Sequence, residues 1–377
     1  MPSWMKHLIN SLLCFLCITG LGYAQSGKKE KTLLTYERVN KDSLGVSYEQ
    51  RIYRNPFNGF VELRYSLSDT SNQRYIPLFQ GVPIASYQKI GSGIYSKPLS
   101  ASASRQVGVN KWFPQKDYKL DFSLLPLLTA KFGNFDNPVE AKFSVALNTQ
   151  LILGRGLALT TGLTIPIVND LDQQSLRLRL APTFINKFLT FRKFNFMSLS
   201  AGLFYKDQYG LNAQYRYFDV NSPWSFGLEG SYSGYYRISG DYFEYQSIRH
   251  LMVLGDVSYR IFKNDITLKL SGGQFLYKDR GVRFDFIRQF SNVEIGFYAL
   301  KTTNGTSVGF NFAIPIPPGV IMQGKRVRLR TADEFRWEYL YVKGYQIAER
   351  YRTGYQLDEK LRTYHSSYWD NQLKRGL

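Results

Sequence analysis

The sequence ITLKLSG, residues 266–272, alternates apolar and polar side chains. In an extended chain Ile266, Leu268 and Leu270 lie on one side, and Thr267 and Lys269 lie on the other. Because successive side chains of a β-strand point to opposite faces, this period of two predicts a strand with one apolar and one polar face.

The same alternation recurs along most of the chain. It is visible in SLRLRLAP (175–182), in KRVRLR (325–330) and in FRWEYLYV (335–342), whose aromatic side chains share one face. Further strands are predicted over 141–153, 157–167, 196–205, 224–234, 250–262, 293–302 and 307–316. Short connections suit neighbouring antiparallel strands, so we predict an all-β fold of about 12 to 16 antiparallel strands.

The composition favours a membrane protein of the β class. The chain contains 28 Tyr and 27 Phe, yet its mean hydropathy is slightly negative. After the first 24 residues no apolar stretch approaches the roughly 20 residues of a membrane-spanning helix, which excludes helical membrane proteins. A soluble β-sandwich of this length would need a domain boundary, and no linker is visible between 118 and 342. The pattern predicts an antiparallel transmembrane β-barrel, in which every second residue contributes to the apolar face.

The first 24 residues have the pattern of a secretory signal peptide. A basic start is followed by the apolar run LINSLLCFLCITGLG and by small residues suited to cleavage after Ala24. A membrane anchor, or lipid attachment at Cys14 or Cys17, is the alternative. These are the only cysteines, so residues 25–377 can form neither a disulfide nor a thiolate metal site. We expect export to the outer membrane of a bacterial envelope.

The remaining chain divides into three parts. Residues 25–114 form an N-terminal segment with early strands, one of them GFVELRYSLSD (59–69), and with a loop at 91–106 that is a candidate lid or plug. Residues 115–342 form the outer-membrane β-barrel. The tail, 343–377, is densely charged and carries apolar residues at helical spacing, which predicts a short, partly helical periplasmic extension.

Catalytic chemistry is not indicated by the residue pattern. His250 stands alone in a predicted strand and His365 stands alone in the tail, so no two-histidine metal site and no Ser-His-Asp arrangement can be read from spacing. Asp170 and Asp172 lie in a predicted turn, where Asp is expected to bond the backbone. We predict a protein that is not an enzyme, with no catalytic residues, no metal, no cofactor and, because of its compartment, no nucleic-acid partner.

Charge suggests what the barrel interior does. The formal net charge is +19, and several cations lie opposite the apolar face of predicted strands. A basic lumen would attract anionic solutes, an anionic polysaccharide among them, because its low-dielectric wall focuses the field. Alternatively these cations bind lipopolysaccharide phosphates or pair with acids such as Asp285 and Glu294. The lumen candidates are Arg177, Arg179, Arg216, Lys269, Arg283, Arg326 and Arg328.

One short pattern is written twice. YKDQYGLNAQYRYF (205–218) and YKDRGVRFDFIRQF (277–290) share Tyr-Lys-Asp at a spacing of 72 residues, whereas their glycines differ by one place. We interpret each as a hairpin in which Asp accepts backbone N–H bonds within the turn and Gly supplies a positive φ. Whether Arg216 and Arg288 point into the barrel stays open, because Arg216 alternates with the apolar residues of its strand whereas Arg288 has the same parity as apolar residues of its strand. The predicted turn residues are Tyr205, Asp207, Gly210, Tyr277, Asp279 and Gly281.

The second copy and the strands after it resemble the YjbH-type outer-membrane β-barrel family. The resemblance covers about 195–320, with a similar entry segment at EQRIYRNPFNG (49–59). It implies a role beside exopolysaccharide or capsule secretion, among outer-membrane lipids, lipopolysaccharide and other envelope proteins. The alternatives are a general or anion-selective diffusion porin and a structural subunit of a larger outer-membrane complex. The resemblance is carried by Gly273, Tyr277, Asp279, Gly281, Arg288, Phe290, Asn292, Gly296, Thr302 and Pro315.

Overall fold

The computed structural model describes residues 33–68, 73–107, 118–132, 139–172, 174–239, 242–340, 347–351, 353–354 and 356–376. The predicted signal peptide, 1–24, lies outside the described residues. No helix among the described residues is long and apolar enough to cross a membrane.

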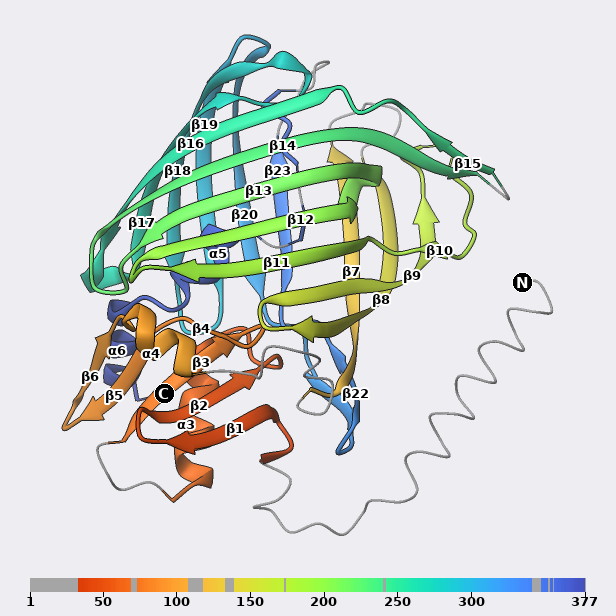
Figure 1. The fold of residues 1–377 in the computed structure, drawn as a ribbon. Coiled ribbons are helices and arrows are strands. Elements are labelled where there is room, and N and C mark those ends of the chain that lie inside the picture. The colour runs from red at the N-terminus through yellow and green to blue at the C-terminus, as the bar shows by residue number, and fades with distance from the viewer. Residues whose placement is uncertain are drawn as a thin grey trace.

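A large antiparallel sheet makes up most of the molecule (Figure 1). Each long strand pairs with the next along the chain, as the alternation predicted, and the pairing order returns to its start, so that the sheet forms a barrel. Four short strands, β10 (Arg179–Leu180), β15 (Tyr242–Tyr245), β21 (Val320–Gln323) and β22 (Val327–Thr331), accompany them. The long strands are β7 (Leu120–Phe132), β8 (Val139–Gly154), β9 (Leu157–Asn169), β11 (Thr183–Phe191), β12 (Asn195–Leu203), β13 (Gln208–Phe218), β14 (Trp224–Ser239), β16 (His250–Ile261), β17 (Ile266–Gln274), β18 (Arg280–Gln289), β19 (Glu294–Thr302), β20 (Gly305–Ile314) and β23 (Phe335–Leu340). The all-β, antiparallel prediction is confirmed, whereas insertion in a membrane stays a prediction.

The polar side chains point inward and the apolar side chains point outward. In β17, Thr267 and Lys269 are buried inside the barrel, whereas Leu270 is 50% exposed on the outside. The period of two that fixes the strand therefore also divides its side chains between the interior and the outer surface. A soluble sheet that buries one face would show the opposite arrangement.

The two ends of the sheet meet at a seam between β7 and the β22–β23 segment. β22 pairs with β7 in parallel, from Val327–Leu120 to Thr331–Leu124, and β23 then pairs antiparallel with β20. Next to the seam the buried guanidinium of Arg328 contacts Asp121 at 2.6 Å and also contacts Glu37. Burial raises the pKa of Glu37, but the guanidinium groups of Arg51 and Arg328 outweigh it and lower the pKa to about 2.

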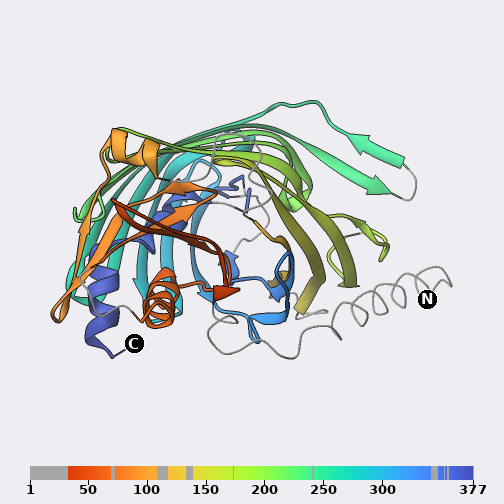
Figure 2. The same ribbon diagram turned by 60° about the horizontal axis from the view of Figure 1, so that its bottom comes forward.

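A small N-terminal unit covers one end of the barrel (Figure 2). Its strands are β1 (Tyr36–Asp42), β2 (Gly45–Gln50), β3 (Arg74–Phe79), β4 (Val82–Pro83), β5 (Ser86–Ile90) and β6 (Gly93–Lys97), and its helices are α3 (Pro56–Ser66) and α4 (Ala101–Gln106). The turns at 219–223 and 290–293 touch this unit: Asn55 Nδ2 donates to Ser291 O at 2.6 Å, and Asn221 Nδ2 donates to Ser96 O at 3.1 Å. We call this the capped end; the opposite end, with turns at 204–207, 275–279 and 303–304, is the far end.

Two expectations for the N-terminal unit were wrong. The predicted strand at 59–69 is mostly helix α3, because Asn55 caps it by accepting from Phe57 N at 3.0 Å and Pro56 occupies its first turn. The predicted loop at 91–106 contains strand β6 and helix α4, with Ser100 as the cap of α4.

The charged tail runs through the interior of the barrel instead of extending away from it. Ala348 N donates to Asp279 at the far end, Leu357 N donates to Gln214 on the inner wall at 2.7 Å, and Ser366 N donates to Val220 O at the capped end. Helices α5 (Leu357–Arg362) and α6 (Ser366–Lys374) confirm partial helicity. The prediction of a detached extension is corrected, because the tail's charges have partners on the wall.

Helix α6 joins the tail to the N-terminal unit. The ring of Trp369 is fully buried, stacks on Tyr87 with centroids 3.8 Å apart, and contacts Phe57 and Phe60 of α3. These rings belong to the largest hydrophobic cluster of the described residues, so the two ends of the chain share one core at the capped end.

Candidate functional site

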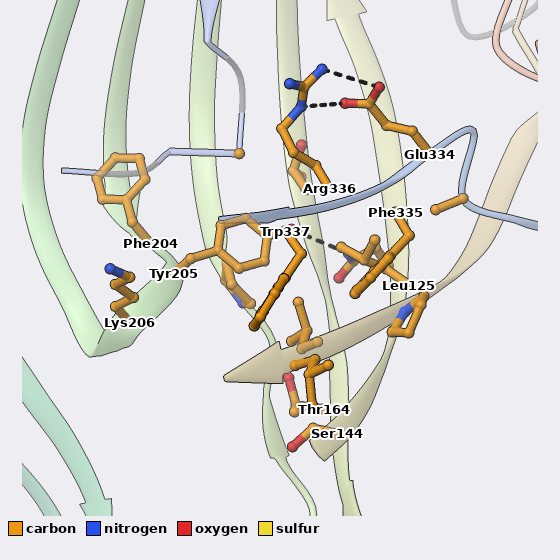
Figure 3. A pocket seen from close by; sticks show the side chains of 18 of the residues that line it. Leu125, Ser144, Thr164, Phe204, Tyr205, Lys206, Glu334, Phe335, Arg336 and Trp337 are labelled. Atoms are coloured by element: carbon orange, nitrogen blue, oxygen red, sulfur yellow. Dashed lines mark hydrogen bonds and ion pairs between the residues drawn. The ribbon is translucent and has the colours of Figure 1, made fainter. Parts of the chain in front are cut away.

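A cavity of about 600 Å³ lies inside the barrel, between the wall formed by β7, β8, β9 and β11 and the threaded tail. Figure 3 shows the turn residues Phe204, Tyr205 and Lys206 on one side of it and Glu334–Trp337 on the other, with Ser144 and Thr164 below. Both faces of β7 line the cavity over 125–130, so it reaches into the seam.

Hydroxyl and amide groups of β8 and β9 form the polar side of this cavity. Ser144, Asn148, Thr160 and Thr164 occupy alternate, inward positions of the two strands and are all buried. The Oδ1 atom of Asn148 and the Oγ1 atom of Thr160 have no hydrogen-bond partner among the described residues. Because buried polar atoms are nearly always paired, these two oxygens indicate a place where a bound molecule or water completes the bonding.

Aromatic and aliphatic side chains form another side. Phe184 and Phe204 stack with centroids 5.2 Å apart, and Tyr205 lies next to them with its hydroxyl 3.5 Å from Asn148 Nδ2. Leu125 of β7 adds apolar surface. A few polar groups among aromatic surfaces are typical of small-molecule sites.

The charges around the cavity are nearly balanced. Its lining includes eight basic and seven acidic side chains, so their formal sum is 8 − 7 = +1. Pairs account for much of this balance: Arg336 lies 2.9 Å from Glu334 and 3.2 Å from Glu359, which the tail supplies. Lys206 pairs with Glu349 at 3.3 Å in the same way. The cavity therefore does not present the one-signed field that would concentrate anions.

The predicted lumen cations occupy different positions in the structure. Arg216, Lys269, Arg283 and Arg328 all point inward and are buried, but each contacts a carboxylate: Asp256, Asp358, Asp285 and Asp121 respectively. Pairing with acids, which was one of the open alternatives, therefore describes these four. Arg179 borders the cavity and bonds Gln174, whereas Arg177 and Arg326 are exposed and do not line it.

The repeated pattern is a structural repeat, but its true offset is 71 residues. The closing bonds are Phe204 N to Gln208 O and Phe275 N to Asp279 O. In each hairpin a pair of glycines lies opposite, Gly202 with Gly210 and Gly273 with Gly281. Glycine spacing, and not the Tyr-Lys-Asp identity, therefore marks the equivalent positions.

The turn residues themselves depart from the expected chemistry. Positive φ falls on Lys206 and Asp207 in one turn and on Tyr277 and Lys278 in the other, while Gly281 has no positive φ. Gly281 is required for a different reason: a Cβ there would lie 2.2 Å from a backbone oxygen of the neighbouring strand. Gly210 does have a positive φ, of 141°.

Asp279 bonds outside its own turn. Its Oδ1 accepts from Thr303 Oγ1 at 2.7 Å and from Asn304 N at 3.1 Å, and its Oδ2 accepts from Ala348 N of the tail at 2.8 Å. Burial raises the pKa of Asp279, but these bonds outweigh it and hold the pKa below its ordinary value. Asp207 instead accepts from Gln174 Nε2 at 2.6 Å.

The one-residue difference between the two offsets, 71 and 72, also explains why Arg216 and Arg288 point in opposite directions. Arg216 points into the barrel, whereas Arg288 is exposed on the outside and lies over the ring of Phe290. A shift of one residue moves a side chain to the other face of a strand.

The histidines do not converge. His250 contacts Tyr235 and Tyr277 at the far end, and His365 caps α6 at the capped end by accepting from Ser367 N at 3.1 Å. Among the described residues no group of three or more His, Cys, Asp or Glu side chains could hold a metal ion.

Sequence reasoning missed the cavity residues and the tail carboxylates. Asn148 and Thr160 share the polar parity of predicted strands 141–153 and 157–167, so the alternation could have placed them inside. No local pattern could have placed Asp358 beside Lys269, 89 residues earlier.

These features define a class: an antiparallel β-barrel with a polar interior that its own C-terminal segment occupies. The family model described as exopolysaccharide biosynthesis protein YbjH (YjbH) matches residues 88–323. Since this is more than half of the chain, the protein belongs to the YjbH family, and the resemblance over 195–320 is confirmed and extended. No curated protein and no solved structure matches the chain.

Proposed function

We propose that this protein is a non-enzymatic outer-membrane barrel that assists the export or surface assembly of an exopolysaccharide. The family match supports the link to exopolysaccharide. One structural observation supports an accessory role: the tail fills part of the interior from the far end to the capped end, so the barrel is not an empty pore.

Membrane insertion is supported by the outer surface. Leu228, Phe297 and Val308, on three different strands, are 60%, 59% and 63% exposed. Soluble proteins rarely expose large contiguous apolar patches, whereas a barrel in a bilayer presents such a band to the hydrocarbon. Trp224 and Tyr259 pair with centroids 4.7 Å apart near the capped end, where an aromatic girdle would lie.

The capped end suits the periplasmic side. Its hairpin turns at 155–156, 192–194, 219–223, 262–265 and 290–293 are short, and the connections that carry β10 and β15 lie at the far end. The connection 315–334, which carries β21 and β22, is the one long connection among the described residues at the capped end. Outer-membrane barrels have short periplasmic turns and longer outer loops. In this orientation the N-terminal unit and α6 lie in the periplasm, where they can contact other export proteins.

A deletion strain tests the proposed role. Removal of the gene should lower secreted exopolysaccharide, and the full chain expressed in trans should restore it. Unchanged secretion in the deletion strain would overturn the proposed function.

Conductance separates this role from that of a diffusion porin. The intact protein should be closed in a planar bilayer because the tail runs through the interior of the barrel, and deletion of 347–377 should raise the conductance. Steady conductance of the intact protein, equal to that of the truncated one, would favour the porin.

A further inference from the structure

Several buried neutral groups of the inner wall have an atom without a hydrogen-bond partner among the described residues, and Asn148 and Thr160 are two of those that border the cavity. Asn148 and Thr160 are each 7% exposed, lie on the inner wall, and have an oxygen without a hydrogen-bond partner among the described residues. Both border the cavity of about 600 Å³. The wall thus offers unused hydrogen-bonding capacity next to an empty volume large enough for a small ligand.

The lining indicates the chemistry of the occupant. Hydroxyl and amide groups of Ser144, Asn148, Thr160 and Thr164 line the same cavity as the half-buried ring of Tyr205, whose hydroxyl lies 3.5 Å from Asn148 Nδ2. A sugar ring matches this arrangement, since it carries hydroxyl groups around its edge and apolar C–H groups on its faces. A fatty acyl chain would leave the polar wall unsatisfied.

The charges indicate that this sugar is neutral. The eight cations and seven anions of the lining nearly cancel, and the tail supplies carboxylates such as Glu349 and Glu359 that pair with Lys206 and Arg336. A polyanion would meet these carboxylates directly, and six of the eight cations already pair with a carboxylate.

We propose that the cavity between β7–β9, β11 and the tail binds a neutral saccharide segment of the exported polymer. Asn148 and Thr160 bond its hydroxyl groups, and Tyr205 packs against a ring face. This inference rests on the proposed function and adds the substrate class and the residues that bind it.

A matched pair of double variants tests the site in cells. Asn148→Leu with Thr160→Val removes two unpaired oxygens that border the cavity. Thr267→Val with Ser231→Ala removes two buried hydroxyls that also lack partners but do not line the cavity. In all four residues the side-chain oxygen is unpaired within the described residues, and the one bond that the cavity variant removes, from Asn148 Nδ2 to the Tyr205 hydroxyl, is long at 3.5 Å. Neither variant should therefore lower barrel abundance.

The cavity variant should reduce secreted polysaccharide at least fivefold at unchanged abundance, and the control should secrete normally. If the gene deletion abolishes secretion but the cavity variant secretes normally, the saccharide site is wrong while the proposed function stands. If the gene deletion does not lower secretion, the proposed function is wrong, and the saccharide site that rests on it is wrong as well.

Binding to the purified full chain tests the neutral character. Maltotetraose, cellotetraose and chitotetraose are compared with tetragalacturonate by isothermal titration. At least one neutral probe should bind tenfold more tightly than tetragalacturonate, and the cavity variant should lose that binding. Tighter binding of tetragalacturonate, or binding of none of the neutral probes, would overturn the assignment.

Discussion

Asp279→Asn should release the tail at the far end without breaking the hairpin. The amide oxygen of Asn can still accept from Thr303 and Asn304, but its NH₂ group would then face the N–H of Ala348, 2.8 Å from the present Oδ2. One hydrogen bond to a charged acceptor is lost, at about 1.5–3 kcal/mol. This corresponds to a roughly 10- to 140-fold increase in local opening of the tail.

Hydrogen–deuterium exchange with mass spectrometry measures this opening. Amides of 347–351 should exchange faster by that factor, while those of β17 and β18 keep their rates. Asp219→Asn is the matched control, because Asp219 accepts from Asn221 N in a turn at the capped end. Unchanged exchange in 347–351 would refute the anchoring role of Asp279, and equally faster exchange in β17 and β18 would show that Asp279 maintains the hairpin itself.

Three further changes test the capped end and the repeat. Burial lowers the pKa of His365 to about 3, so the unfolded chain binds more protons between that value and the ordinary 6.5, and stability is lost as pH falls through this window. When the pH falls from 6.5 to 5.0, the free energy of unfolding, measured by chemical denaturation, should fall by about 2 kcal/mol more in the unsubstituted protein than in the His365→Gln variant. Equal losses in the two proteins would contradict this. Trp369→Ala should lower the free energy of unfolding by about 3–5 kcal/mol, because the buried ring stacks on Tyr87; a change below about 1 kcal/mol would exclude a shared core. Gly281→Val should lower the melting temperature more than Gly272→Val, because the nearest atom to an added Cβ lies at 2.2 Å in the first case and 3.3 Å in the second; similar melting temperatures would show that the close approach is unimportant.

The strand pattern was predictable because it is local. Thr267 and Lys269 alternate with apolar residues, and a period of two is enough to define a strand and its two faces. The signal for helix α3 was also present, as Asn55 followed by Pro56, but the apolar residues after it were interpreted with the wrong period.

The site was less predictable because its contacts are distant in sequence. Lys269 was correctly placed on the polar face, yet its partner Asp358 belongs to a tail that looked like a separate extension. The repeat was aligned on Tyr205 and Tyr277, which are one residue out of register, and this error left the facing of Arg216 and Arg288 open.

Chemical cross-linking tests most directly whether the tail lies inside the barrel. Residues 25–377 contain no cysteine, so Lys269→Cys with Asp358→Cys creates a single pair, at positions whose side chains now meet at 2.5 Å. Leu270→Cys with Asp358→Cys is the control, because Leu270 is the next residue and faces outward. A short bismaleimide should join the 269–358 pair and leave the 270–358 pair unjoined; equal cross-linking of both pairs, or of neither, would contradict a tail threaded through the barrel.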